Sequence, residues 1–576
     1  MSRPRNRAFP SHLLAAILCL GSFTSPAQPA PKPKAPKSVA GLPPDKALAL
    51  GERMYREGLL PSGEPMQAVV SNDITIAGTA FTCVSCHLRS GVGSQEGGVV
   101  TLPTNDTKLA QPRYWKFPNL SPEERKELRL HYPAARPAYT DETLAHVLRT
   151  GQDPGGRDLQ NIMPRYDLSD RDMDILTHYL RSLSVRISPG VDDETIRFAT
   201  VITDEVSKQD QEAMLVSMSN FVARHNQHAS GFGNRMYLNI GGQEMSGAYR
   251  KLALSVWRLK GAPDTWDRQL QACLDKEPVF ALLGGLTTGE WRPIHTFCER
   301  QKLPCLFPLT DLPVISRSDW YTLYFSRGYY QEGQAVARYL HSLDDPAPAR
   351  RVLQIIQAGP EGRDLAAGFR ETMQELAQER DPRPGEGTVK DILLAKGEIL
   401  DAAALRALLE SEKPTSVLLW TGAGSFEALA SLTDHPGFVF MSARMLGGKV
   451  FALPVQARPF TWFTYPYRDP RNEPAVSRYA NSLLTGLPVH KPETRISTRT
   501  YSMLELLWRG LVELDRNLYR DNLLDRISML GDHVLPDYLR LSFGPGQRYA
   551  SKSCFIMQLS GGPSPQLVRK SDWVIH

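Results

Sequence analysis

The sequence feature that most constrains this chain is the run Cys83-Val84-Ser85-Cys86-His87. Two thiols at this spacing meet the two vinyl groups of a haem, and the adjacent imidazole is brought beneath the iron. The motif therefore predicts one covalently bound haem c, anchored by Cys83 and Cys86 and ligated by His87. Thioredoxin-like redox pairs and zinc sites also use a C-x-x-C spacing. The histidine that follows and the absence of a second C-x-x-C in the sequence favour haem.

A sixth iron ligand is expected from Met163, in the segment Asn161-Ile162-Met163-Pro164-Arg165-Tyr166. Pro164 fixes the backbone next to the thioether. A histidine and methionine pair raises the potential relative to two histidines and leaves no open iron position, so we expect electron transfer and not an enzyme. The same region contains rival ligands, which we interpret as packing or surface residues: Met66, Met173, His131, His146 and His178.

The amino terminus has the pattern of an export signal. Three arginines within the first seven residues precede an apolar stretch, Leu13 to Phe23, and small residues follow. We predict a Sec-type signal peptide over residues 1–30 and a periplasmic location. The apolar stretch is shorter than the roughly 20 residues that span a bilayer, and membrane contact is expected only if the signal stays uncleaved as an anchor. Residues 31–44 are rich in proline and lysine and predict an extended linker.

A chain of 576 residues is too long for a single ordinary core. Helical spacing from Asp45 and a helix capped by Ser169 bracket a domain at 45–185, and 186–195 is the expected linker. From residue 196 to 576, apolar runs alternate with helical stretches, which predicts parallel sheets in two α/β lobes. The runs are Phe198–Ile202, Met236–Ile240, Phe280–Leu283, Val352–Ile356, Val417–Trp420 and Phe438–Met441.

Charge and cysteine content narrow the expectations further. The formal net charge of +5 is small and dispersed, so docking to an acidic protein or membrane surface is the most it indicates, and nucleic acid binding has no support. Four cysteines lie outside the haem motif and the leader: Cys273, Cys298, Cys305 and Cys554. An oxidising compartment permits disulfides among them, for example Cys298 with Cys305, but sequence does not choose among three connectivities, and buried free thiols are the alternative.

The stretch from Gly51 to Leu183 resembles a class I monohaem cytochrome c domain. The resemblance rests on Gly51-Glu52-Arg53-Met54-Tyr55, the C-x-x-C-H motif, Thr143-Leu144 to Gly151, Met163-Pro164 and the closing helix. It implies an all-α domain with His87 as proximal and Met163 as distal ligand. An insertion at about Arg89 to Arg136 departs from a minimal member of the family.

Residues from about Ile196 to the end resemble a type I periplasmic solute-binding protein of the branched-chain amino acid and amide receptor kind. The resemblance rests on Phe280–Gly285 with Thr287-Thr288, Leu303–Thr310, Tyr324–Arg327, Gly362-Arg363-Asp364 to Phe369, and Ser542–Arg548. It implies two α/β lobes around a cleft that holds a small ligand by hydroxyls and backbone amides. The candidate contacts are Thr287, Thr288, Thr310 and Thr421; helix capping is the other common use of such threonines. Trp291, Trp462 and Tyr465 are candidates to line the cleft or to pack in the core.

Together these observations predict a periplasmic electron carrier whose binding lobes recognise a ligand or a protein partner. The resemblance makes redox partner proteins in the periplasm, such as a quinoprotein dehydrogenase, and a small ligand such as an amino acid or amide the expected partners. The alternative is a solute receptor of an ABC-type uptake or sensing system with an accessory haem. Haem catalysis is the third reading, and Met163 argues against it.

Overall fold

The computed structural model describes residues 38–575 except 72, 97–98, 114–120, 122, 124–134, 233–249, 317, 380–386, 472–494, 515, 534 and 544–545. The predicted signal peptide at 1–30, the first half of the linker at 31–44, the run Met236–Ile240 and His131 lie outside the described residues.

Two helices form the frame of the amino-terminal domain, as the apolar spacing predicts. Helix α1 (Pro44–Glu57) buries Ala47, Gly51, Met54 and Tyr55 against α6 (Asp170–Ser182). The Ser169 hydroxyl accepts the Asp172 backbone N–H at 3.2 Å, which is the predicted cap of α6. The shorter helices are α2 (Cys83–His87), α3 (Asp106–Leu109) and α5 (Asp141–Thr150).

The expectation that this domain is all-α is wrong. Strands β1 (Gln67–Val70), β2 (Ile74–Ala77) and β5 (Arg165–Asp167) form an antiparallel sheet in the order β2-β1-β5. A second small pair joins β3 (Gln95–Glu96) to β4 (Val99–Val100). Segments outside the helices must also pair their backbone N–H and C=O groups, and here they do so by forming short strands that pair with one another.

The first lobe of the carboxy-terminal region is built on a five-stranded parallel sheet in the order β10-β9-β8-β6-β7. Its strands are β6 (Thr195–Thr203), β7 (Lys251–Leu259), β8 (Ala281–Leu283), β9 (Cys305–Leu306) and β10 (Thr322–Leu323). Its helices are α7 (Lys208–Phe232), α8 (Trp266–Lys276), α9 (Arg292–Arg300), α16 (Ile496–Leu514) and α17 (Arg520–Ser528), with the short η2 (Pro263–Thr265). Strand β7 was not expected, although its alternating pattern is typical of a strand with one buried face.

The second lobe is built on the sheet β12-β11-β13-β14-β15-β16-β17, in which β18 also pairs with β16. Its parallel strands are β11 (Arg351–Gln357), β12 (Thr388–Leu394), β13 (Ser416–Trp420), β14 (Phe438–Ser442) and β15 (Thr461–Tyr465). Antiparallel strands β16 (Ser553–Leu559), β17 (Leu567–Arg569) and β18 (Val574–Ile575) complete it. Its helices are α10 (Gly328–Ser342), α11 (Pro360–Glu379), α12 (Ala402–Glu412), α13 (Phe426–Ala430) and α14 (Ala443–Leu446), with the short η3 (Ala347–Ala349), η4 (Ala423–Ser425), η5 (Gly447–Ala452) and η6 (Val455–Ala457).

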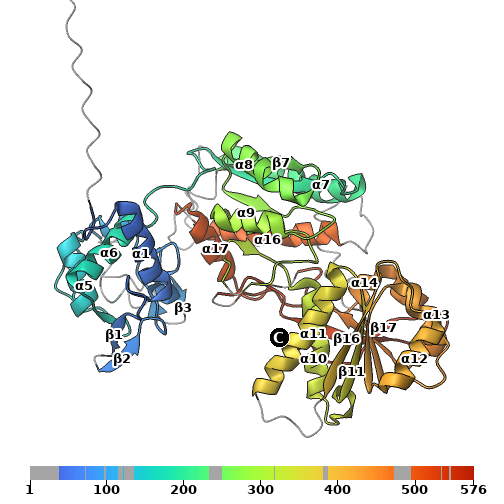
Figure 1. The fold of residues 1–576 in the computed structure, drawn as a ribbon. Coiled ribbons are helices and arrows are strands. Elements are labelled where there is room, and N and C mark those ends of the chain that lie inside the picture. Colours follow the sequence, from blue (N-terminus) through green and yellow to red (C-terminus); the bar gives the residue numbers. More distant parts are fainter. Residues whose placement is uncertain are drawn as a thin grey trace, which may run out of the picture.

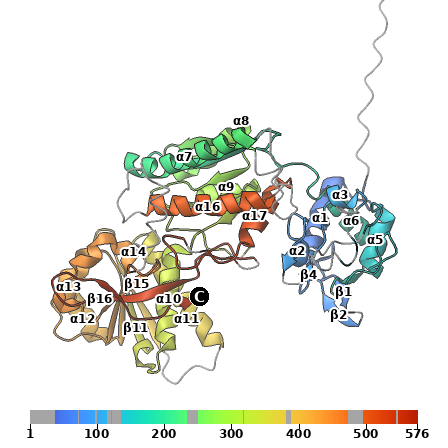
Figure 2. The ribbon, with the colours of Figure 1, turned by 180° about the vertical axis from the view of Figure 1, so that it is seen from behind.

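The two predicted α/β lobes are therefore confirmed, and the chain passes between them more than once. Helices α16 and α17 come late in the sequence but lie with α7 to α9, whereas β16 and β17 lie in the second lobe (Figures 1 and 2). Five of the predicted apolar runs fall on the strands β6, β8, β11, β13 and β14. Within the described part of the chain, no helix is both long and apolar enough to cross a bilayer.

The amino-terminal domain contacts the first lobe through α17 and its surroundings (Figure 2). Ser90, three residues beyond His87, donates its backbone N–H and its hydroxyl to one oxygen of Asp525, at 3.1 and 2.9 Å. Arg56 on α1 pairs with Asp521 at 2.9 Å. Arg89 lies over the ring of Trp320 at 3.8 Å from its centre. The segment that follows the haem motif is thus held directly by the two-lobed region.

Candidate functional site

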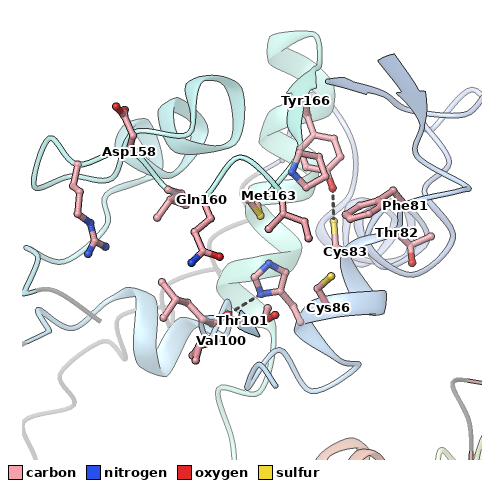
Figure 3. Close-up of a pocket in the computed structure, with 16 residues that line it drawn as sticks. Phe81, Thr82, Cys83, Cys86, Val100, Thr101, Asp158, Gln160, Met163 and Tyr166 are labelled. Atoms are coloured by element: carbon pink, nitrogen blue, oxygen red, sulfur yellow. Dashed lines mark hydrogen bonds between the residues drawn. The ribbon is translucent and has the colours of Figure 1, made fainter. Parts of the chain in front are cut away.

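The residues of the C-x-x-C-H motif line a cavity of about 350 Å³ in the amino-terminal domain. Figure 3 shows Met163 on one side of this cavity and Cys83 and Cys86 on another. The lining is mostly apolar and is formed by Phe81, Thr82, Cys83, Cys86, His87, Val100, Thr101, Leu102, Arg157, Asp158, Leu159, Gln160, Ile162, Met163, Pro164 and Tyr166. All four residues that the sequence analysis assigned to haem therefore face one space.

The imidazole of His87 is held in one orientation. Its Nδ1 lies 2.7 Å from the carbonyl oxygen of Leu102, and because a carbonyl only accepts, Nδ1 carries the proton. Nε2 is then the nitrogen that has a lone pair for a metal, an arrangement typical of metal-binding histidines. Burial lowers the pKa of His87 to about 4, so the ring is neutral near pH 7. Leu102 lies in the insertion, whose role the sequence analysis did not foresee.

The residues present fit a haem. Short helix α2 places Cys83 and His87 on its buried side, and Cys86 also lines the cavity. The loop between α5 and β5 brings Met163 to the same cavity from a distant part of the chain. The Tyr166 hydroxyl lies 3.6 Å from the Cys83 sulfur and closes that end. Among the described residues, no group of three or more His, Cys, Asp and Glu side chains converges as a metal site.

The rival ligands that the structure describes lie elsewhere. Met66 and Met173 are fully buried in the packed core of the domain, with exposed fractions of 0 and 2 %. His146 and His178 line a different hollow, between α5 and α6. Of the described candidates, Met163 is the one that shares the cavity with His87.

A second cavity, of about 700 Å³, lies between the two lobes. The first lobe contributes Val206, Ser207, Asp210, Leu286, Thr287, Thr288, Leu309 and Asp311, and its helix α16 contributes Ile496 and Arg499. The second lobe and the chain that leaves it contribute Ala443, Arg444, Gly447, Gly448, Val450, Phe451, Tyr465, Tyr467, Pro470, Arg495 and Leu567. Because both lobes form its walls, we call this cavity the interlobe cleft.

The candidate threonines are divided by the structure. Thr287 and Thr288 line the interlobe cleft. Thr310 uses its hydroxyl to accept the Leu312 backbone N–H, and Thr421 is buried with its hydroxyl bonded to Ser425 at 2.9 Å; neither of these two lines the cleft. Both hydroxyls therefore bond within local turns, and neither threonine is the N-cap of a helix, which was the other expected use.

The candidate aromatic residues are divided in the same way. Tyr465 lines the cleft. Trp291 is fully buried in the core of the first lobe, and Trp462 packs against the core of the second. Tyr467, which the sequence analysis did not single out, lines the cleft two residues after Tyr465.

The charged residues of the cleft were also missed. Asp311 accepts hydrogen bonds from Arg444 at 3.0 Å and from Arg499 at 3.1 Å, so it links α14 of the second lobe to α16. Although burial alone would raise it, these two guanidinium groups hold the pKa of Asp311 below its usual value. The available signal was the position of Arg444 two residues after the buried strand β14, because the carboxyl ends of parallel strands face the cleft in such sheets.

The described cysteines are free thiols in the structure. Cys298 and Cys305 are fully buried and hydrogen-bonded to each other, and burial raises the pKa of the Cys298 thiol well above its usual value. The two residues that the sequence analysis named as a candidate pair are therefore neighbours.

No family model matches the chain, and no curated protein matches it. Solved structures of solute-binding proteins match about two thirds of the chain. A solute-binding protein of an ABC transporter from Rhodopseudomonas palustris BisB5, in complex with 3,4-dihydroxybenzoic acid, is 14% identical over 67% of this chain and 99% of its own, with a TM-score of 0.45. A branched-chain amino acid ABC transporter protein from Thermus thermophilus with bound valine is 12% identical over 67% and 98%, with a TM-score of 0.44. A leucine-binding protein from Thermotoga maritima is 14% identical over 65% and 98%, with a TM-score of 0.42. At such low identities and TM-scores, nothing about function passes from these proteins to the chain.

Proposed function

We propose that this chain is an exported electron-transfer protein that carries one haem c in its amino-terminal domain. The observation that supports this most is the convergence of Cys83, Cys86, His87 and Met163 on one largely apolar cavity. Haem bound there would accept and release one electron at a time. The proposed cellular location is the periplasm, because a C-x-x-C-H motif and an amino-terminal export pattern occur in the same chain.

The residues around the cavity have separate tasks in this proposal. Cys83 and Cys86 anchor the group, and His87 supplies a neutral nitrogen that Leu102 orients. Met163 would hold the group from the other side of the cavity and would leave no place on the metal for water or substrates. Apolar residues that line the cavity, such as Leu102 and Leu159, would limit the access of water to the haem and so favour its less charged redox state. Redox partner proteins, with a quinoprotein dehydrogenase as one candidate donor, would approach this domain.

The test is a redox titration of the haem-loaded protein and of Met163→Ala, followed by visible absorbance. Loss of the thioether is expected to lower the midpoint potential by roughly 0.1 V or more, a small part of the about 0.8 V over which axial ligands tune haem. The variant should also bind added imidazole at the open position. Met66→Leu, in the core of the same domain, is the matched control and should titrate like the parent. An unchanged spectrum and potential in Met163→Ala would contradict the ligand assignment.

A second candidate function is that of a solute receptor with an accessory haem. The observation that favours it is the interlobe cleft, which has polar walls from both lobes, including Thr287, Thr288 and Arg444. A receptor is expected to bind its ligand with the same affinity whether the haem is oxidised or reduced. In an electron carrier that senses a ligand, the midpoint potential would instead shift on binding. The contacts between Ser90 and Asp525 provide a physical connection for such a shift.

A further inference from the structure

The charges that line the interlobe cleft do not balance. Three guanidinium groups, those of Arg444, Arg495 and Arg499, face two carboxylates, those of Asp210 and Asp311. Two further carboxylates lie behind the wall: Asp537 pairs with Arg495 and Glu332 with Arg444. Burial raises the pKa of Glu332 to about 7, so near neutral pH it offsets the charge of Arg444 only in part. With these two carboxylates counted, the charges in and behind the wall are close to balance, so a preference for an anion can arise only locally, at a guanidinium group with an unused N–H.

The buried guanidinium group of Arg444 has N–H donors that no protein acceptor uses. Its side chain is only 4 % exposed. Nη1 donates to Asp311 at 3.0 Å. Nε forms an ion pair with a Glu332 oxygen at 3.2 Å, but neither Nε nor Nη2 has a hydrogen-bond partner. The same Asp311 oxygen also accepts from Arg499, so one carboxylate oxygen serves two guanidinium groups. A buried N–H without an acceptor is costly, and a ligand oxygen would remove that cost.

The rest of the cleft is suited to an apolar body. Leu286 and Leu309 from the first lobe face Val450 and Phe451 from the second. Phe451 is 49 % exposed, although large aromatic side chains are usually covered. A cavity of about 700 Å³ is within the range of small-molecule sites. Thr287 and Thr288 line the first-lobe wall, where the Thr288 hydroxyl donates to Glu205 at 2.8 Å and the Thr287 hydroxyl accepts the Gly289 backbone N–H at 3.2 Å.

We propose that the interlobe cleft binds a small carboxylic acid with an apolar body, its carboxylate against Arg444 and its body along Leu286, Val450 and Phe451. This proposal deepens the receptor function proposed above and rests on it. A carboxylate brings two acceptor oxygens, which match the planar guanidinium group. The zwitterion of an amino acid also needs a partner for its ammonium group. Asp311 is already engaged by two arginines, and Asp210 accepts the Ser207 hydroxyl at 2.7 Å, so the acid without the amino group is favoured.

The test is isothermal titration calorimetry of the full haem-loaded protein with matched compounds. These are 4-methylpentanoate, its amide and leucine, with benzoate and benzamide as an aromatic pair. At least one of the two acids is expected to bind saturably. Its amide is expected to bind at least roughly tenfold more weakly, because a charge-assisted hydrogen bond is replaced by a neutral one. Leucine is expected to bind more weakly than 4-methylpentanoate.

Variants separate the site from the rest of the protein. Arg444→Gln is expected to weaken acid binding roughly tenfold or more, and Arg444→Lys to recover only part of the loss, because lysine keeps the charge but not the fork. The matched control is Arg509→Gln, on α16 but in an exposed pair with Glu505 outside the cleft, which should bind like the parent. If Arg444→Gln does not fold, Phe451→Ala is tested in its place. This variant is expected to weaken the binding of 4-methylpentanoate.

Several outcomes would overturn the proposal. An amide that binds as tightly as its acid, or a folded Arg444→Gln protein with unchanged affinity, would remove the carboxylate assignment. Binding of leucine or an amide without either acid would leave the receptor function standing and overturn the ligand class. No binding of any of the five compounds at millimolar concentration would overturn both, while the haem spectrum would report separately on the electron-transfer proposal.

Discussion

At the scale of single residues, the contact between Ser90 and Asp525 has the clearest consequence. Both side chains are buried where the amino-terminal domain meets the first lobe, and Asp525 accepts two hydrogen bonds there. Burial, with a smaller effect of the nearby Asp521 carboxylate, raises the pKa of Asp525 to about 6. The other charged or titratable groups that act on it are Arg89, Arg548 and Tyr55.

This shift predicts that low pH stabilises the folded, docked protein, because Asp525 takes up a proton more readily there than in the unfolded chain. Because its pKa is higher in the folded than in the unfolded chain, its contribution is full below about pH 4 and is lost as the pH rises through 6. Between pH 7 and pH 5 the free energy of unfolding should rise by about 1 kcal/mol from this group. Asp525→Asn removes the titration and keeps an acceptor for Ser90. We expect the difference in the free energy of unfolding between parent and variant, measured by urea unfolding, to change between pH 7 and pH 5. Parallel curves of this free energy against pH would contradict the prediction.

At the scale of elements, the close packing of α1 on α6 forms the frame of the amino-terminal domain. Gly51 allows the approach, because a Cβ atom at that position would lie 2.5 Å from the Tyr179 Cβ and 2.7 Å from the Ile175 carbonyl oxygen. Tyr55 and Tyr179 continue the contact with ring centres 5.4 Å apart. The Tyr55 hydroxyl then donates to the Leu88 carbonyl at 2.7 Å, next to His87. The helix pair thereby supports the haem motif.

Gly51→Ala is expected to push the two helices apart. Overpacking of a close contact costs about 1–3 kcal/mol, which exceeds the gain of up to about 1 kcal/mol from replacing a helical glycine. Lys46→Ala, on the exposed side of α1, is the control and should change the free energy of unfolding little. The measurement is urea unfolding of the full protein followed by circular dichroism. Equal stability of parent and Gly51→Ala would show that the frame tolerates the methyl group.

At the scale of the whole molecule, charged pairs hold the amino-terminal domain against the two-lobed region. Arg56 and Asp521 form the less exposed pair, with side chains 14 and 19 % exposed. Glu52 and Lys302 form a second pair at 2.9 Å, where Lys302 is largely exposed and the energy accordingly small. The Trp320 ring lies between Arg89 and Arg548, whose guanidinium carbons are 3.8 and 3.6 Å from its centre. Such an arrangement predicts one fixed relative position of the two parts.

Exchange of the Arg56 and Asp521 charges tests this docking. Arg56→Asp and Asp521→Arg alone each place like charges together and should loosen the contact by about 1–3 kcal/mol, whereas the double exchange should restore much of it. The radius of gyration in solution, from small-angle scattering, should increase in each single variant and return toward the parent value in the double variant. An identical radius in all four proteins would show that this pair does not hold the domains together.

The sequence by itself determined the local features of this protein. Spacing within five residues singled out Cys83, Cys86 and His87, which line one cavity. Apolar periodicity located α1 and α6, and buried apolar runs marked five strands of the two lobes. These features depend on neighbours in the chain, and their physical cause is the period of the helix or strand itself. The same reasoning missed β7 and the small sheets of the amino-terminal domain, because short alternating segments form strands only when a partner strand is present.

Only the tertiary structure decided which distant side chains share a site. It brought Leu102 to His87, Arg444 and Arg499 to Asp311, and Asp525 to Ser90, across separations that no local pattern encodes. It also placed Thr287 and Thr288 in the wall of the cleft and left Thr310 and Thr421 outside it. The physical reason is that burial and charge pairing act through space, so the function of a polar residue depends on the fold that surrounds it.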